Sequence, residues 1–79
     1  MPVSWEERVT VDPDVLVGKP VVKGTRVAVE FVIELLAEGW SEPDIIKNYP
    51  RLAPEDIRAC LAYARDRLQE EITYPLQVG

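Results

Sequence analysis

Two short segments near the start of the chain have apolar patterns typical of strands, and one of them alternates between polar and apolar residues. The alternating segment is RVTV, at residues 8–11, and the second, PVVK at residues 20–23, is apolar-rich and bounded by Gly18 and Gly24. A period of two predicts a β-strand, and it places Val9 and Val11 on one face of the first strand. The intervening DPD, at residues 12–14, favours a turn. The first quarter of the chain therefore predicts two short strands followed by a helix.

The apolar spacing becomes helical from Ala28 onward. In the segment AVEFVIELLAEG the apolar residues at helical spacing are Val29, Val32, Ile33 and Leu36, and the acidic residues Glu30, Glu34 and Glu38 form one stripe. Gly39 is a natural C-terminal stop. Because the rest of the circumference is apolar, this helix has surface for two partners: the domain's own core and, most simply, a second copy of the chain. We predict a dimer interface at Phe31, Leu35 and Trp40.

Two further helices are predicted in the second half of the chain. Ser41 can cap a short helix that has Pro43 in its first turn and ends at Tyr49. A longer helix opens at Pro54, with acidic residues in its first turn that suit the helix dipole. Its apolar face is formed by Ile57, Leu61, Ala64 and Leu68, with Cys60 beside them.

These elements predict a mainly α-helical fold. We expect a three-helix helix-turn-helix domain, homeodomain-like or winged-helix-like, with a short N-terminal β element. We assign residues 1–7 to an N-terminal arm, residues 8–68 to the domain and residues 69–79 to a C-terminal tail. Trp5, in the arm, either anchors a partner or folds back onto its own domain.

The composition favours a small oligomeric protein. The chain has 79 residues, one cysteine, no histidine and a formal net charge of −5. A domain of this size buries only about 60% of the surface that its unfolded chain exposes, and we expect neither a disulfide nor a zinc site to compensate. Such domains often gain stability by oligomerising, which also favours a homodimer. We expect neither a signal peptide nor a membrane-spanning segment, and therefore a cytoplasmic protein.

The stretch GKPVVKGTR, at residues 18–26, concentrates glycine and basic residues as a phosphate-binding loop would. A nucleotide-binding P-loop places lysine directly after its second glycine, whereas here Lys23 precedes Gly24. We therefore interpret the stretch as a connector in which Gly18 and Gly24 supply backbone angles that other residues resist. We expect Gly24 and Thr25 to build this structural loop together with Lys19, Lys23 and Arg26. The three basic residues are also candidates to contact a phosphate backbone or to pair with Asp12 and Asp14.

No catalytic constellation can be assembled from the sequence. Without histidine there is no imidazole base, and the only serines are Ser4 and Ser41. Cys60 falls on the apolar face of a helix, where a cysteine is a small core residue rather than a nucleophile. We predict that the chain is not an enzyme and that it requires no cofactor or metal.

Four basic residues form a candidate DNA-binding patch in and before the last helix: Lys47, Arg51, Arg58 and Arg65. In a helix-turn-helix the N-terminal end of the last helix enters the major groove. Glu55 and Asp56 occupy that turn, and together with the acidic net charge they oppose contact with phosphates. A solvated helix face with ordinary charge pairs, such as Glu55 with Arg58, explains the same residues equally well.

Several motifs together resemble the domain-of-unknown-function 433 family. They are Asp12-Pro13, GKPV and GTR, followed by LLAEGWS, YPRL and PEDIRACLAYA, and they cover residues 8–68. The resemblance implies a helix-turn-helix fold that is usually dimeric. One departure is Ala53, where a capping threonine or serine is more usual. Its loss should weaken the start of the last helix by about 0.5–2 kcal/mol.

Many members of that family look like VapB-type antitoxins encoded beside a toxin that resembles a PIN-like ribonuclease. The resemblance implies that this chain binds and neutralises such a toxin and represses its own operon by binding operator DNA. It supplies no catalytic residue. The tail is a candidate toxin-binding segment through Glu70, Tyr74 and Leu76. The alternatives are a stand-alone DNA-binding regulator and a protein-interaction module that does not bind DNA.

Overall fold

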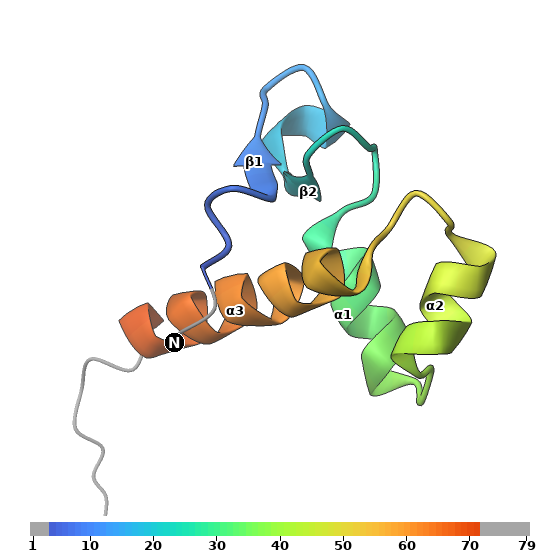
Figure 1. Ribbon diagram of the computed structural model, residues 1–79. Coiled ribbons are helices and arrows are strands. Elements are labelled where there is room, and N and C mark those ends of the chain that lie inside the picture. Colours follow the sequence, from blue (N-terminus) through green and yellow to red (C-terminus); the bar gives the residue numbers. More distant parts are fainter. Residues whose placement is uncertain (1–3, 72–79) are drawn as a thin grey trace, which may run out of the picture.

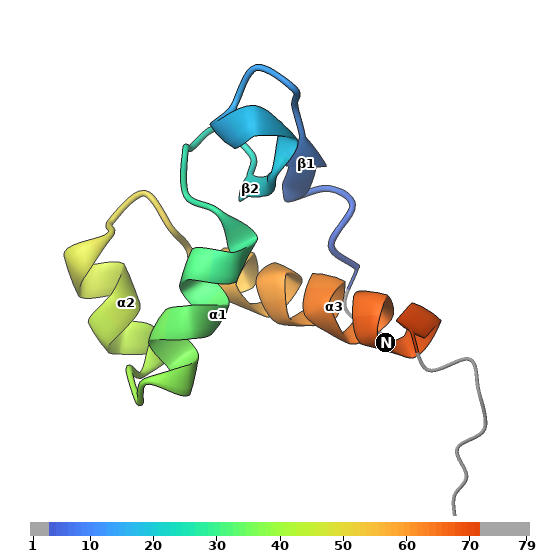
Figure 2. The ribbon, with the colours of Figure 1, turned by 180° about the vertical axis from the view of Figure 1, so that it is seen from behind.

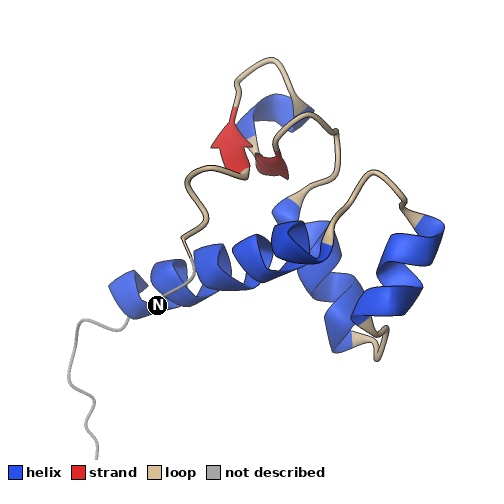
Figure 3. Ribbon diagram, viewed as in Figure 1, coloured by secondary structure: helices blue, strands red, loops and turns tan. Residues whose placement is uncertain are grey.

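In the computed structural model, which describes residues 4–71, three α-helices lie beside a two-stranded sheet (Figures 1 and 3). The elements in chain order are β1 (Val9–Val11), a 3-10 turn η1 (Leu16–Gly18), β2 (Pro20–Val22), α1 (Val29–Ala37), α2 (Glu42–Asn48) and α3 (Pro54–Glu71). The predicted mainly helical fold with an N-terminal β element is therefore confirmed. Because α3 continues to Glu71, Gln69 and Glu70 belong to the helix and not to the tail.

The two strands form an antiparallel hairpin that packs on the helices at one end. Val9 pairs with Val22, and Val11 pairs with Pro20. Val9 and Val22 are buried, whereas Val11 is 56% exposed although it lies on the same face of β1 as Val9. Burial therefore decreases along the three residues of β1, and only Val9 reaches the core.

The turn between α1 and α2 follows the local signals in the sequence. Gly39 has a φ of +101°, and its N–H donates to the carbonyl of Leu36 at 3.0 Å, as in a glycine-terminated helix end. At the start of α2, the Ser41 hydroxyl accepts the N–H of Asp44 at 3.2 Å, and the Asp44 carboxylate accepts the N–H of Ser41 at 3.3 Å. Both the predicted stop and the predicted cap are confirmed.

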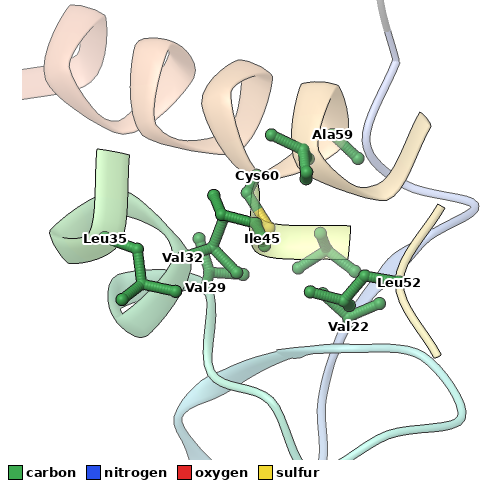
Figure 4. Close-up of a cluster of buried hydrophobic side chains, with 10 residues drawn as sticks. Val22, Val29, Val32, Leu35, Ile45, Leu52, Ala59 and Cys60 are labelled. Carbon is green, nitrogen blue, oxygen red and sulfur yellow. The ribbon is translucent and has the colours of Figure 1, made fainter. Parts of the chain in front are cut away.

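The core lies between α3 and the sheet, where α1, α2 and the N-terminal half of α3 meet (Figure 4). Its fully buried side chains include Val32, Ile45, Ile57 and Cys60. Burial, together with the nearby charge of Asp56, raises the pKa of the Cys60 thiol to about 12. The thiol therefore stays protonated at neutral pH and acts as a core residue, as predicted.

The apolar face that we predicted for α3 is only partly buried. Ile57 and Cys60 are 0% exposed, but Leu61 is 45% and Leu68 is 57% exposed, so the prediction was wrong for these two leucines. Leu61 directly follows Cys60 and points about 100° away from it on a helix of 3.6 residues per turn. Since α1 and β1 pack against the Cys60 side, both leucines face solvent.

Candidate functional site

The β2–α1 turn and the connector between α2 and α3 lie side by side (Figures 1 and 2). Nη1 of Arg51 donates to the carbonyl oxygen of Gly24 at 3.1 Å, which joins two segments that the sequence separates. Lys23 and Arg26 flank Gly24 in the chain, and both are exposed. We name Lys23, Gly24, Arg26 and Arg51 the basic turn cluster.

The turn itself is built by Gly24 and Thr25. The N–H of Thr25 donates to the carbonyl of Val22 at 3.0 Å, and Gly24 has a φ of +77°, as the third position of a type II turn requires. The Thr25 hydroxyl donates to Val22 at 2.8 Å and accepts the N–H of Val27 at 3.0 Å. Gly18 also has a positive φ, +80°. The predicted structural role of the two glycines is confirmed, and Thr25 closes the turn.

The first lysine of this stretch does not pair with the aspartates. Nζ of Lys19 lies 3.2 Å from Oε2 of Glu30, while Asp12 accepts the N–H of Asp14 at 2.9 Å and so stabilises a local turn. The same hairpin loop holds Val17 in a left-handed conformation, φ +57°, with 94% of it exposed. A β-branched residue rarely adopts this conformation.

The solvent side of α3 carries alternating arginines and leucines. Arg58, Leu61, Arg65 and Leu68 follow one another at spacings of three and four residues, so they share one face, and we name them the outer stripe. Arg58 forms no ion pair within residues 4–71, whereas Nε of Arg65 donates to Asp66 at 2.9 Å. A shallow depression of about 320 Å³ lies between Arg58, Leu61 and Arg65. Sequence analysis missed the two leucines because it assigned them to the core.

The first turn of α3 is anchored to the N-terminal segment. Asp56 is only 8% exposed; its carboxylate accepts a hydrogen bond from Nη1 of Arg8 at 2.9 Å and from the N–H of Ala53 at 2.8 Å. The second bond is half of a capping box, so the helix start keeps one cap interaction despite Ala53. Glu55 is exposed, and within the described residues it does not form the pair with Arg58 that we considered.

The four predicted DNA contacts do not form a single patch on one helix. Lys47 lies in the last turn of α2. Arg51 lies in the connector and is held by Gly24. Arg58 and Arg65 lie on the outer stripe of α3. Tertiary structure instead places Arg51 with Lys23 and Arg26, which sequence analysis had treated as a separate group.

Trp5 folds back onto its own domain. Its ring packs edge-to-face on Tyr63, with centroids 4.9 Å apart, and its Nε1 donates to Oδ2 of Asp66 at 2.7 Å. Hydrogen bonds from Arg65 and then from Trp5 lower the pKa of the Asp66 carboxyl. Of our two interpretations of Trp5, the structure therefore supports the contact within the chain.

The predicted dimer surface on α1 is partly used inside the protomer. Leu35 is only 6% exposed and belongs to the core, so its assignment to a dimer interface was wrong. Phe31 stacks edge-to-face on Tyr49, with centroids 5.5 Å apart. The apolar side of α1 that we assigned to a second copy thus packs against residues of α2 and its C-cap. Phe31 and Trp40 remain half-buried.

Of the three predicted toxin-binding residues, only Glu70 lies within the described residues. It is exposed, and its Oε1 lies 3.3 Å from Nη1 of Arg67 on the same helix. Tyr74 and Leu76 lie outside the described residues. Within residues 4–71, the acidic and cysteine side chains form no group of three that could hold a metal ion, and no helix is long and apolar enough to cross a membrane.

Comparison with known proteins identifies the family. Residues 9–64 match the family described as "Protein of unknown function (DUF433)". The chain belongs to this family. The match includes both the GTR motif and the YPRL motif, which meet in the contact between Arg51 and Gly24. The resemblance noted from the sequence is thus confirmed for the family itself.

Two relatives give the extent of this similarity. The chain is 45% identical over 58 residues to "Uncharacterized protein y4eO" of Sinorhizobium fredii (strain NBRC 101917 / NGR234), covering 73% of this chain and 26% of that protein. The chain therefore spans about a quarter of the length of this curated relative. The crystal structure of a DUF433 member from Anabaena variabilis ATCC 29413 matches with a TM-score of 0.71 and 24% identity, over 85% of this chain and 69% of that one. The second similarity establishes the fold.

Proposed function

We propose that this DUF433 protein is an antitoxin-like regulator that binds a partner protein through the outer stripe of α3. The observation that carries the proposal is the exposure of Leu61 and Leu68, 45% and 57%, beside Arg58 and Arg65. Removing apolar surface from water contributes about 25 cal/mol per Å², which favours a protein partner over solvent at this face. Arginine is also enriched in protein interfaces, where its long side chain packs as well as pairs.

The partner suggested by the family resemblance is a PIN-like ribonuclease toxin. The net charge of −5 would complement a basic channel that binds RNA. On α1, Glu34 and Glu38 are exposed and form no ion pair within residues 4–71, so they are available to such a surface. Glu70, Tyr74 and Leu76 would extend the contact beyond the outer stripe. Inhibition of this kind would take place in the cytoplasm, where the RNA substrate is.

The test uses the purified product of the gene next to the one that encodes this chain. Calorimetric titration should show binding at a fixed ratio, and cleavage of single-stranded RNA by the neighbour should stop once that ratio is reached. Leu61→Asp should weaken binding at least about tenfold, since it places a charge in an apolar contact. Val11→Asp is the matched control, because Val11 is similarly exposed, at 56%, on β1. A neighbour that does not bind, or equal losses in both variants, would overturn the proposal.

A homodimer remains part of the proposal, with Phe31 and Trp40 as its apolar contacts and Leu35 removed from the set. Sedimentation velocity across a hundredfold range of protein concentration tests it. A single species with the mass of one chain at every concentration would exclude the dimer, whereas Trp40→Ala should lower the dimer's affinity if the surface is assigned correctly.

Operator binding is the second candidate, and the contact between Arg51 and Gly24 favours it. This contact brings Arg51 to the turn that contains Lys23 and Arg26. Fluorescence anisotropy on the upstream DNA and on a scrambled duplex, at several salt concentrations, distinguishes operator binding from a protein-interaction module. Preference for the upstream sequence would support a regulator, and Arg26→Ala should reduce the salt slope by about one phosphate contact. Equal weak binding to both duplexes would leave a protein-interaction module.

A further inference from the structure

The C-terminal half of α3 extends past α1 (Figures 1 and 2). A groove lies between residues of β2, α1 and this part of α3. The groove measures about 550 Å³, within the usual range for binding pockets. It lies on a different side of α3 from the depression on the outer stripe, and its lining is mostly apolar: Pro20, Val29, Ile33, Tyr63, Ala64 and Leu68. Leu68 borders both the groove and the outer stripe.

The two charged residues that border the groove already have partners. Glu30 pairs with Lys19 at 3.2 Å. Arg67 pairs with Glu70 at 3.3 Å, and its guanidinium lies 5.8 Å from the centre of the Tyr63 ring. Within the described residues, the groove therefore offers no unpaired charge that would attract a charged occupant. The groove therefore favours an uncharged occupant with apolar side chains.

The chain itself supplies such a segment directly after α3. Residues 72–79 read ITYPLQVG and contain no charged residue. Every second residue is apolar or aromatic, at Ile72, Tyr74, Leu76 and Val78. This alternation is typical of an extended segment with one apolar face. Pro75 supports the extended form, because a proline disfavours the helical conformation in the residue before it.

The connection is short enough for the segment to reach the groove of its own chain. The segment starts after Glu71, one helical turn beyond Leu68. From Leu68 back to Tyr63 the groove follows α3 for only about 7.5 Å, at a rise of 1.5 Å per residue. Eight extended residues span up to about 26–29 Å, so several remain to make the reversal. We propose that residues 72–79 fold back beside α3 and place their apolar face in the groove between α1 and α3.

This contact would cover Leu68 and Ile33 in the free protein while leaving Leu61 exposed. It does not require the proposed toxin to exist. If both proposals hold, a toxin that binds Tyr74 and Leu76 competes with the groove for the same segment, and the groove becomes open in the complex.

The test places a nitroxide spin label at Val78→Cys in a Cys60→Ala background and measures the paramagnetic broadening of side-chain methyl signals. We expect strong broadening of the Ile33 and Leu68 methyls and little effect on Ile46 of α2, which is the internal control. Unchanged Ile33 and Leu68 signals would overturn the proposal. A mixture of spin-labelled chains without isotope enrichment and isotope-enriched chains without a spin label distinguishes a contact within one chain from a contact between two copies. Broadening that persists in the mixture would assign the contact to a second copy and overturn the fold-back within one chain.

A second measurement does not depend on the label. Deletion of residues 72–79 should shift the methyl signals of Ile33 and Leu68 and leave those of Leu61 in place. Leu68→Glu in the full chain should move the amide shifts of residues 72–79 toward those of a free peptide. Since Leu68 is 57% exposed, this variant is expected to fold. Deletion without effect on Ile33 and Leu68 would contradict the proposal.

Discussion

The two halves of α3 have the same apolar periodicity and opposite surroundings. In the first half, Ile57 and Cys60 are fully buried by α1, α2 and the sheet, and Asp56 is tied to Arg8. From Leu61 onward the leucines face solvent, and Trp5 packs against Tyr63 of the same helix. The comparison teaches that periodicity identifies the residues that share a face, whereas the neighbouring elements decide which faces are buried.

The largest expected effect contrasts one apolar residue from each half. Ile57→Ala should lower the free energy of unfolding by about 2–5 kcal/mol, because the side chain is 0% exposed and leaves a cavity. Leu61→Ala, at 45% exposure, should change it by less than about 0.5 kcal/mol. Urea denaturation followed by tryptophan fluorescence measures both. Similar losses would mean that Leu61 is buried in solution by another copy of the chain.

Thiol labelling sharpens the same contrast between adjacent positions. Burial raises the pKa of Cys60 to about 12, so at pH 8 it has very little reactive thiolate, and the reagent cannot reach it. A cysteine placed at Leu61, in a Cys60→Ala background, should react with a disulfide reagent at least about a hundredfold faster than native Cys60. Urea should abolish the difference. Equal native rates would contradict the burial of Cys60.

The anchoring of the first half is tested at two adjacent acidic residues. Asp56→Ala removes the bonds to Arg8 and to the Ala53 N–H. We expect a loss of about 2–3 kcal/mol, since both bonds involve a charged group and one caps the helix. Glu55→Ala is the matched control, because Glu55 is exposed and has no such partners. Its effect should stay within about 0.5 kcal/mol. Equal effects of the two substitutions would show that the bonds of Asp56 do not stabilise the start of α3.

The turn between β2 and α1, which contains Gly24, should be sensitive to backbone strain alone. A Cβ atom at Gly24 would have no neighbour within 4 Å, but the φ of +77° is unfavourable for any side chain. Gly24→Val should therefore cost about 1–2 kcal/mol. Gly24→Asn should cost less, since asparagine tolerates this conformation. An unchanged melting temperature for Gly24→Val would contradict the turn geometry.

The smallest effect concerns the second half of α3, where Trp5 contacts Tyr63 and Asp66. Trp5→Phe keeps an aromatic ring near Tyr63 but removes the donor to Asp66. The pKa of Asp66, lowered first by Arg65 and then by Trp5, should rise toward its ordinary value without reaching it. A lowered carboxyl pKa stabilises the fold above the unfolded-state pKa, and this contribution is lost as the pH falls through the folded-state pKa. Carboxyl NMR titration of both proteins measures the change, and identical titration curves would contradict the hydrogen bond.

Much of the fold was accessible from the sequence because its signals are local. The helix boundaries at Gly39 and Ser41 depend on residues within one turn, and both were predicted correctly. The outer stripe was accessible in principle, since Arg58, Leu61, Arg65 and Leu68 stand at helical spacing. It was missed because apolar residues were assumed to be buried, and hydrophobic periodicity does not reveal where a neighbouring helix ends.

The candidate site depends on contacts that no local pattern contains. The sequence alone determined the element types, the special angles at Gly24 and Gly39, and the capping of α2, because backbone sterics and short-range hydrogen bonds act between near neighbours. Tertiary structure decided that Arg51 meets Gly24, 27 residues away, and that Arg8 meets Asp56, 48 residues away. It also decided that Leu35 is core and Leu68 is surface. The physical reason is that α1 has nine residues and α3 has eighteen, so a short helix can cover only part of a long one.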